Sequence, residues 1–221
     1  MPLAEVRRAL GAGFGSNTSP PMRMTTMGEL VMVDFITAAL LDGRGYQIRS
    51  GTIATGLSAQ NVIADQTADM CVDAASGTTI IPVDFRIALR EVNTALTLQV
   101  AVKAVGTASS AGTAFVPLPL KQDGAAAVST ARVQADTVTV AAELATTTRR
   151  LFEYENGATQ TPATVGMNIA SGTIAATATQ LRYIGTGVAC VYVQVASTTA
   201  QTLYFATLDY LEFPTLLVNP S

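Results

Sequence analysis

The residue types that carry most enzyme chemistry are scarce in this sequence. It contains no histidine and no tryptophan. Without histidine there can be no Ser-His-Asp or Cys-His nucleophile system and no imidazole acid–base catalyst, and few zinc or iron sites are possible. Carboxylates would have to supply any acid–base chemistry, and the candidates are Glu153, Glu155, Asp209 and Glu212. We interpret these four as polar positions of strands or loops, so we expect no catalytic residue and no enzyme.

Three regularly spaced aspartates raise the question of a metal site. Asp65, Asp69 and Asp73 would share one face of a helix, because each lies four residues after the last. Like charges on that face repel each other, and the closing glutamate of an EF-hand loop is missing. A calcium-binding loop remains an alternative, but we predict no metal and no cofactor.

Two further features could be read as chemical motifs. The segment Gly11-Ala-Gly13-Phe-Gly15 lacks a preceding strand and the Gly-Lys-Ser/Thr ending of a phosphate-binding loop, so we interpret it as a flexible stretch. Cys71 and Cys190 stand outside any Cys-x-x-Cys or Cys/His pattern. We expect buried free thiols, although the sequence leaves open whether their Cα atoms lie within the roughly 7 Å that a disulfide requires.

Composition limits the partners of the chain. Only 13% of the residues are charged, against about 25% in typical soluble domains, which predicts that other subunits cover part of the surface. The net charge of −3 argues against nucleic acid as a partner. The most apolar segment, residues 30–41, is too short to span a bilayer and contains Asp34. The N-terminus lacks the apolar core of a secretory signal, which predicts synthesis in a cytoplasm and release, if any, by another route.

Alternation of apolar and polar residues predicts many strands. The clearest run is 81–90, where we expect one strand face to carry the apolar residues Ile81, Val83, Phe85, Ile87 and Leu89. A second run covers 96–103, and residues 92–94 between the two predict a hairpin. The other strand-like runs are 46–53, 113–116, 137–141, 151–154, 180–184, 189–195 and 202–213.

Helical signals are weak by comparison. Residues 30–41 fit either a strand running into a turn or a short buried helix, and no amphipathic helix of three turns follows residue 45. Strand starts, edges or exits are expected at Pro82, Pro117, Pro119 and Pro214. Many short strands without helices between them predict a mainly β chain, an antiparallel β-sandwich of the jelly-roll type.

We divide the chain into three parts. Residues 1–27 are rich in glycine and proline and are expected to form an extended N-terminal arm. The β-sandwich covers 28–214, and 215–221 form a C-terminal tail. Methionine adapts to irregular contact surfaces, and an apolar tail packs on its own domain or on a neighbour. The predicted assembly contacts are therefore Met22, Met24, Met27, Leu216, Leu217 and Val218.

The order of these segments resembles a known group of proteins. A Gly/Pro-rich arm precedes Gly77-Thr-Thr-Ile-Ile-Pro-Val83, which opens an alternating strand, and residues 201–214 read QTLYFATLDYLEFP. Over roughly 45–214 this pattern resembles the jelly-roll structural proteins of tailed bacteriophages, especially head cement or decoration proteins. The resemblance implies trimers or other symmetric clusters seated over joints between capsid subunits, and it carries over no individual site residue.

The sequence thus predicts a non-enzymatic structural protein of a virion. We expect a capsid cement or decoration protein that stabilises the head shell by binding between capsid subunits. Its partners would be itself, with a trimer favoured, and the major capsid protein or other virion subunits. It would be assembled in the host cytoplasm and carried in the virion. The alternatives are a jelly-roll capsid subunit, or a tail, spike or adhesin protein that binds a receptor or a carbohydrate.

Overall fold

A computed structural model describes most of the chain. The described residues are 23–24, 30–31, 35–51, 55–59, 64–92, 98–140, 149–155, 168–173, 184, 187–195 and 202–215. Their helix is α1 (Phe35–Leu41). Their strands are β1 (Arg23–Met24), β2 (Leu30–Val31), β3 (Gly45–Ser50), β4 (Leu57–Ser58), β5 (Thr67–Asp73), β6 (Thr78–Val92), β7 (Leu98–Val105), β8 (Thr113–Phe115), β9 (Leu118–Pro119), β10 (Thr130–Thr139), β11 (Arg149–Glu155), β12 (Asn168–Thr173), β13 (Val188–Val195) and β14 (Thr202–Pro214).

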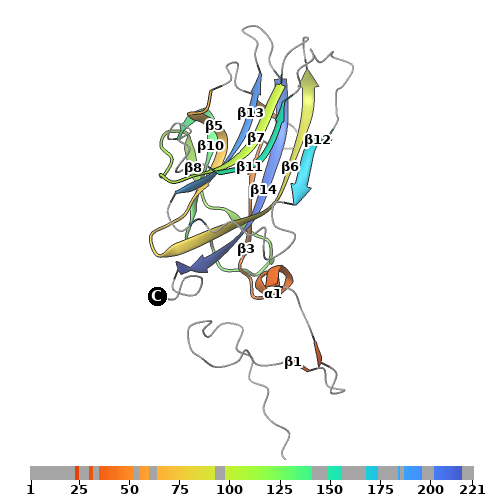
Figure 1. The fold of residues 1–221 in the computed structure, drawn as a ribbon, viewed down its shortest axis with the longest axis vertical. Coiled ribbons are helices and arrows are strands. Elements are labelled where there is room, and N and C mark those ends of the chain that lie inside the picture. Colours follow the sequence, from red (N-terminus) through yellow and green to blue (C-terminus); the bar gives the residue numbers. More distant parts are fainter. Residues whose placement is uncertain are drawn as a thin grey trace, which may run out of the picture.

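Two six-stranded antiparallel sheets pack against each other (Figure 1). Sheet I has the order β12-β6-β14-β3-β9, with β4 paired to β14, and sheet II has the order β11-β7-β13-β5-β10-β8. The short strands β1 and β2 pair with each other outside these sheets. The prediction of a mainly β chain built as an antiparallel sandwich is therefore confirmed.

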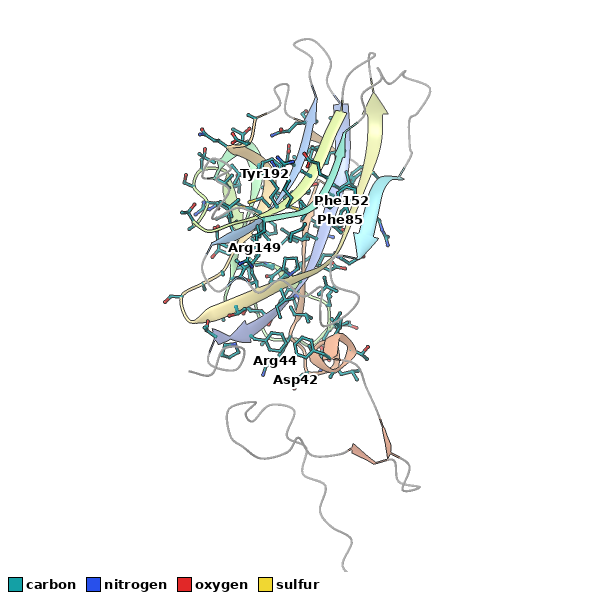
Figure 2. All side chains as sticks on the ribbon, in the orientation of Figure 1. Asp42, Arg44, Phe85, Arg149, Phe152 and Tyr192 are labelled. Carbon is teal, nitrogen blue, oxygen red and sulfur yellow. The ribbon has the colours of Figure 1, made fainter. Side chains whose placement is uncertain are left out.

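The main hydrophobic core lies between the two sheets. Along β14 the side chains of Tyr204, Leu208 and Tyr210 are fully buried in this core, as period-two alternation requires. Figure 2 shows Phe85 of β6 facing Phe152 of β11, and the two ring centroids lie 4.6 Å apart. This aromatic pair joins sheet I to sheet II, and burying a large apolar side chain contributes roughly 1.5–3 kcal/mol.

A β-bulge at Val83 interrupts the longest strand. Along β14, Asp209 lies opposite Asp84, whereas the next residue, Tyr210, lies opposite Pro82. One residue of β6 is therefore left without a partner. Proline has no N–H to donate, and a bulge is one of the few places where a sheet accepts it. Pro82 lies inside β6, so it marks neither the start nor the exit of that strand.

The bulge reverses the face that each β6 side chain occupies. Phe85 and Ile87 face the main core, but Ile81 packs with Leu211 and Phe213 on the other side of sheet I. The prediction that the apolar residues of 81–89 share one face is therefore wrong. Alternation in the sequence continues across the bulge, but an extra residue shifts the following side chains to the opposite face.

The prediction of a hairpin at residues 92–94 is also wrong. β6 pairs with β12 and β14 in sheet I, whereas β7 pairs with β11 and β13 in sheet II. Two alternating runs that are adjacent in sequence predict two strands, but their pattern does not specify that the strands pair. Of the run 180–184, only Ile184 is described, and it forms a bridge with Ile80.

The described part of 30–41 contains both a short strand and a short helix, and the alternative of a buried helix is wrong because α1 is mostly exposed or half-buried. β2 ends at Val31 and α1 begins at Phe35. The Phe35 ring stacks on Phe213 with 5.4 Å between centroids, and the Arg44 guanidinium lies 5.2 Å from the centre of the same Phe213 ring. Only Ala39 of α1 is buried, so the helix lies on the surface of the sandwich rather than inside it.

Sheet II also buries its outer face. On β13, Ala189, Val191 and Val193 face the main core, while the alternate residues Cys190 and Tyr192 belong to a second buried cluster. Residues from β5, β7 and the end of β10 complete that cluster. The register between β10 and β5 shifts between Val133 and Val138, and such an irregularity lets a strand bend.

Candidate assembly surface

Large apolar side chains are exposed at α1 and in the segment 116–128 of the described chain. Single exposed apolar residues are ordinary, but a group of them marks a surface that other molecules cover. Exposed fractions range from 36% for Leu40 to 65% for Val128. The complete set is Leu40, Leu41, Val116, Leu118, Leu120 and Val128.

Part of this group lines a hollow of about 480 Å³. Its lining residues are Thr37, Leu40, Leu41, Leu120 and Lys121, and we call it the α1 hollow. Three leucines make it mainly apolar, and Lys121 is its charged residue. These side chains offer no acid–base pair, so the hollow is suited to accept apolar side chains of another chain rather than to transform a small molecule.

Backbone pairing brings the two sides of the hollow together. β9 pairs with β3, and the Leu120 N–H donates to the Gly45 carbonyl with an N···O distance of 2.9 Å. A methyl group on Gly45 would collide with the Leu40 side chain and lie 3.1 Å from Leu120 Cδ1. The absence of a side chain at Gly45 therefore allows Leu40 and Leu120 to meet above the start of β3.

The assembly contacts predicted from the sequence mostly lie outside the described residues. Met24 is the last residue of β1, where it pairs with Leu30 of β2. The others, Met22, Met27, Leu216, Leu217 and Val218, fall outside the described stretches. All six stay predictions.

The candidate carboxylates do not come together as a catalytic pair within the described chain. Asp209 accepts a hydrogen bond from Gln47 Nε2 at 2.8 Å on the outer face of sheet I. Glu212 is buried on the opposite face of β14, where the Ser129 hydroxyl donates to it. Glu153 forms a surface ion pair with Arg150. The side chain of the fourth candidate, Glu155, is outside the described set.

The three regularly spaced aspartates lie on or next to a strand, not on a helix. Asp69 and Asp73 belong to β5, and Asp65 precedes it. Asp73 accepts hydrogen bonds from the backbone N–H and the hydroxyl of Ser109, whereas Asp69 accepts one from the Val193 N–H at 2.6 Å. Among the described residues, no three His, Cys, Asp or Glu side chains are arranged to hold a metal.

Asp69 is a fully buried carboxyl group in the sandwich. Burial raises its pKa from 3.8 to about 8, while the hydrogen bond from Val193 acts in the opposite direction. Tyr204 of β14 is equally buried, and its interaction with Asp69 also lowers the carboxyl pKa. Burial and the neighbouring Asp69 raise the pKa of the Tyr204 phenol well above its usual value. Asp69 is thus an ionisable group that links the two sheets, not an accessible catalyst.

The sequence left open how close Cys71 and Cys190 lie, and the structure places them opposite each other on neighbouring strands. Cys71 of β5 and Cys190 of β13 are register partners in sheet II. Both are free thiols with 0% exposure, as predicted. Their alignment depends on which strands pair, and residue types alone do not show that.

One local signal in the sequence points to the exposed leucines near the α1 hollow. Leu118 and Leu120 lie next to prolines in the segment Val116-Pro-Leu-Pro-Leu120. Prolines restrict such a segment to an edge or a loop, where its leucines are exposed. For Leu40 and Leu41 no comparable signal exists, because the periodicity of 30–41 does not show which face is buried.

Comparisons with known proteins identify no relative of this chain. No protein-family model matches the chain, and searches of curated proteins and of solved structures found no significant match. Within the described residues, no helix has the length and apolar character needed to cross a membrane. The class that the structure defines is a two-sheet antiparallel β-sandwich, and its function must be argued from its surfaces.

Proposed function

We propose that this sandwich is a jelly roll, a fold of eight strands in two packed sheets in which the strands of the first half of the chain pair with those of the second half. Its eight main strands, in chain order, are β3, β5, β6, β7, β11, β12, β13 and β14. The first pairs with the last, the second with the seventh, the third with the sixth and the fourth with the fifth. These nested pairs support the jelly roll, with β8, β9 and β10 inserted between its fourth and fifth strands.

The chain is proposed to be a structural protein of a virion, a capsid cement or decoration protein that binds between capsid subunits of the head shell. The observation that carries this proposal is the set of exposed apolar residues at α1 and in the segment 116–128, three of which line the α1 hollow. A chain with 13% charged residues and such a group gains stability when neighbouring subunits cover it. Its proposed partners are further copies of itself, as a trimer, and the major capsid protein.

The proposed mechanism is burial of apolar surface repeated over many copies. Each copy covers part of its neighbours, and simultaneous contacts make weak individual affinities effectively permanent. Residues 1–27 act as an extended arm on a neighbouring subunit, and 215–221 add a second contact. No catalytic step, nucleic acid or membrane is part of this mechanism, and the virion assembles in the host cytoplasm.

A jelly-roll capsid subunit is the main alternative. The nested strand pairs support a subunit of the shell as well as a protein that decorates it. The number of copies in a particle separates the two, because a subunit alone accounts for the shell, whereas a decoration protein accompanies a more abundant or equally abundant shell protein.

A receptor-binding or carbohydrate-binding tail, spike or adhesin protein is the second alternative. The outer face of sheet I favours it, because Gln47, Asp209 and Asp84 lie in one row across three strands, beside the exposed side chain of Arg86. Amide, carboxylate and guanidinium groups on an open sheet can bind sugar hydroxyls. Adhesion of the purified protein to glycans or to host cells, lost in Asp209→Asn, would favour this alternative.

Two measurements test the proposed function. Quantitative mass spectrometry of purified particles should find the chain in a near-integral ratio to the shell protein. Purified chain should bind shells that lack it, and Leu41→Gln should weaken this binding by about tenfold, the effect of losing one good apolar contact. Arg86→Gln, on the outer face of sheet I, is the matched control and should bind normally.

Either measurement can overturn the proposal. Absence of the chain from particles would remove the virion role, and a few copies per particle would move it to a tail or spike. Deleting 1–27 should leave a folded sandwich that no longer binds shells, so unaltered binding would refute the arm.

A further inference from the structure

Cys71 and Cys190 are placed as a disulfide requires. Residues directly opposite each other on antiparallel strands have Cα atoms about 4.5–5.5 Å apart, within the range of about 4.4–6.8 Å seen in disulfides. The two cysteines are register partners and belong to the same buried cluster on the outer face of sheet II. We propose that they are the site of a reversible intramolecular disulfide that links β5 to β13.

The Cys71 thiol has a hydrogen-bond partner in the reduced chain. Cys71 Sγ donates to Ser109 Oγ at 3.2 Å, and Ser109 Oγ donates to Asp73 Oδ2 at 2.5 Å. The Asp73 side chain is 14% exposed, and Arg132 Nε lies 3.7 Å from the same carboxylate oxygen. The bond from Cys71 to Ser109 needs the thiol hydrogen, so a disulfide at Cys71 would lose it.

The oxidant is a small disulfide such as oxidised glutathione. The Cys71 thiolate attacks one of its sulfurs, forms a mixed disulfide and releases one glutathione thiolate, which takes up a proton. Cys190 then loses its proton and attacks the Cys71 sulfur, which releases the second glutathione. In total, two protein thiols are oxidised to one disulfide, and one glutathione disulfide is reduced to two thiols.

The surroundings predict a bond that forms slowly and is reduced again readily. Both thiols have 0% exposure, so an oxidant reaches them only when sheet II opens locally. Burial and the neighbouring Cys71 raise the pKa of Cys190, which lowers its thiolate population. Cβ atoms of opposite residues lie about 4.5–5.5 Å apart, whereas a disulfide prefers about 3.8 Å. Closing the bond must pull the strands together, and strained disulfides are the reducible ones.

The time at which the bond closes follows from the proposed function and rests on it. Cytoplasm keeps thiols reduced, whereas the exterior is oxidising. A virion protein would therefore assemble with free thiols and form the bond after release. The bond itself does not depend on this role, since it rests on the register of β5 and β13.

The test uses the full chain, purified with its thiols reduced. Samples are equilibrated in buffers of increasing oxidised-to-reduced glutathione ratio, quenched with acid, unfolded, treated with N-ethylmaleimide and weighed intact. We expect a species that has lost two hydrogen atoms and takes up no N-ethylmaleimide, and it should return to two labelled thiols in dithiothreitol. Cys190→Ala should instead give only unmodified or glutathionylated chain.

Two controls make the result decisive. Ser109→Ala should shift the thiol–disulfide equilibrium toward the disulfide by about fivefold, because it removes a hydrogen bond that only the reduced chain makes, whereas Ser110→Ala keeps that bond and should not. If both thiols of the native chain are still labelled after equilibration in the most oxidising buffer, the sample is repeated in urea below the unfolding transition. Persistent labelling there, or glutathione adducts without the internal bond, overturns the disulfide. Absence of the chain from particles would refute the proposed function and leave this test unaffected.

Discussion

Replacing Asp69 by asparagine should stabilise the sandwich, and by more as the pH rises. The Asp69 carboxyl is fully buried, and burial raises its pKa from 3.8 to about 8. Asparagine has the same shape, and its carbonyl oxygen can still accept the hydrogen bond from the Val193 N–H. The substitution therefore removes the ionisation while it preserves this contact.

The magnitude follows from proton linkage. Below pH 4 both the folded and the unfolded chain hold the Asp69 proton, so this residue does not make stability depend on pH. Between pH 4 and 8 the unfolded chain has lost the proton and the folded chain retains it. The free energy of unfolding therefore falls by about 1.4 kcal/mol for each pH unit, and above pH 8 the loss stays constant. From pH 5 to pH 8 Asp69→Asn should gain on the order of 4 kcal/mol relative to the native chain.

The assay is urea unfolding followed by circular dichroism at pH 5, 6, 7 and 8 and constant ionic strength. Other titrating groups, including Asp209, whose pKa burial also raises, cancel in the difference between the two chains. Asp123→Asn, at an exposed position, is the matched control and should show a small difference that is constant with pH. The reasoning would be refuted if the unfolding free energies of Asp69→Asn and of the native chain changed in parallel with pH. A variant less stable than the native chain at pH 8 would also refute it.

Three further substitutions test the packing. Gly45→Ala should cost less than about 1 kcal/mol in unfolding free energy, because the atom its methyl group meets is the end of the exposed Leu40 side chain, which can rotate away; a loss of several kcal/mol would show that Leu40 is held in place. Phe85→Ala should cost about 3–5 kcal/mol, since it empties the contact between the sheets, and a loss below 1 kcal/mol would exclude it. Leu41→Gln should change stability by less than about 0.5 kcal/mol, because the side chain is 59% exposed; a larger loss would show that Leu41 supports the fold.

Several strands could be predicted from the sequence because alternation is a local property, although β5 and β12 lie outside the predicted runs. The run 202–213 coincides with β14 almost to the residue, and its even positions from 204 to 210 face the main core. The partners of each strand could not be predicted, because pairing joins residues far apart in the chain. β6 and β7 are adjacent in sequence and lie in different sheets, and their alternation is the same as that of a hairpin.

The face on which each residue lies is predictable only while the register is continuous. Ile81 and Phe85 have the same parity in the sequence, but the unpaired Val83 places them on opposite sides of sheet I. Pro82 gave a local hint, since proline in a long strand implies an edge or a bulge. The choice between the two required the strand partners of β6, which alternation does not specify.

The same nonlocal pairing determines where the proposed assembly segments leave the sandwich. The first main strand, β3, pairs with the last, β14, so both ends of the folded unit are neighbours in sheet I. At that end Phe35, which opens α1, stacks on Phe213 near the end of β14. Phe35 and the end of β14 therefore lie together beside α1, whose Leu40 and Leu41 line the α1 hollow. A partner that covers this end can contact the hollow and the end of β14 together, and this is why the apolar group there carries the proposal of assembly.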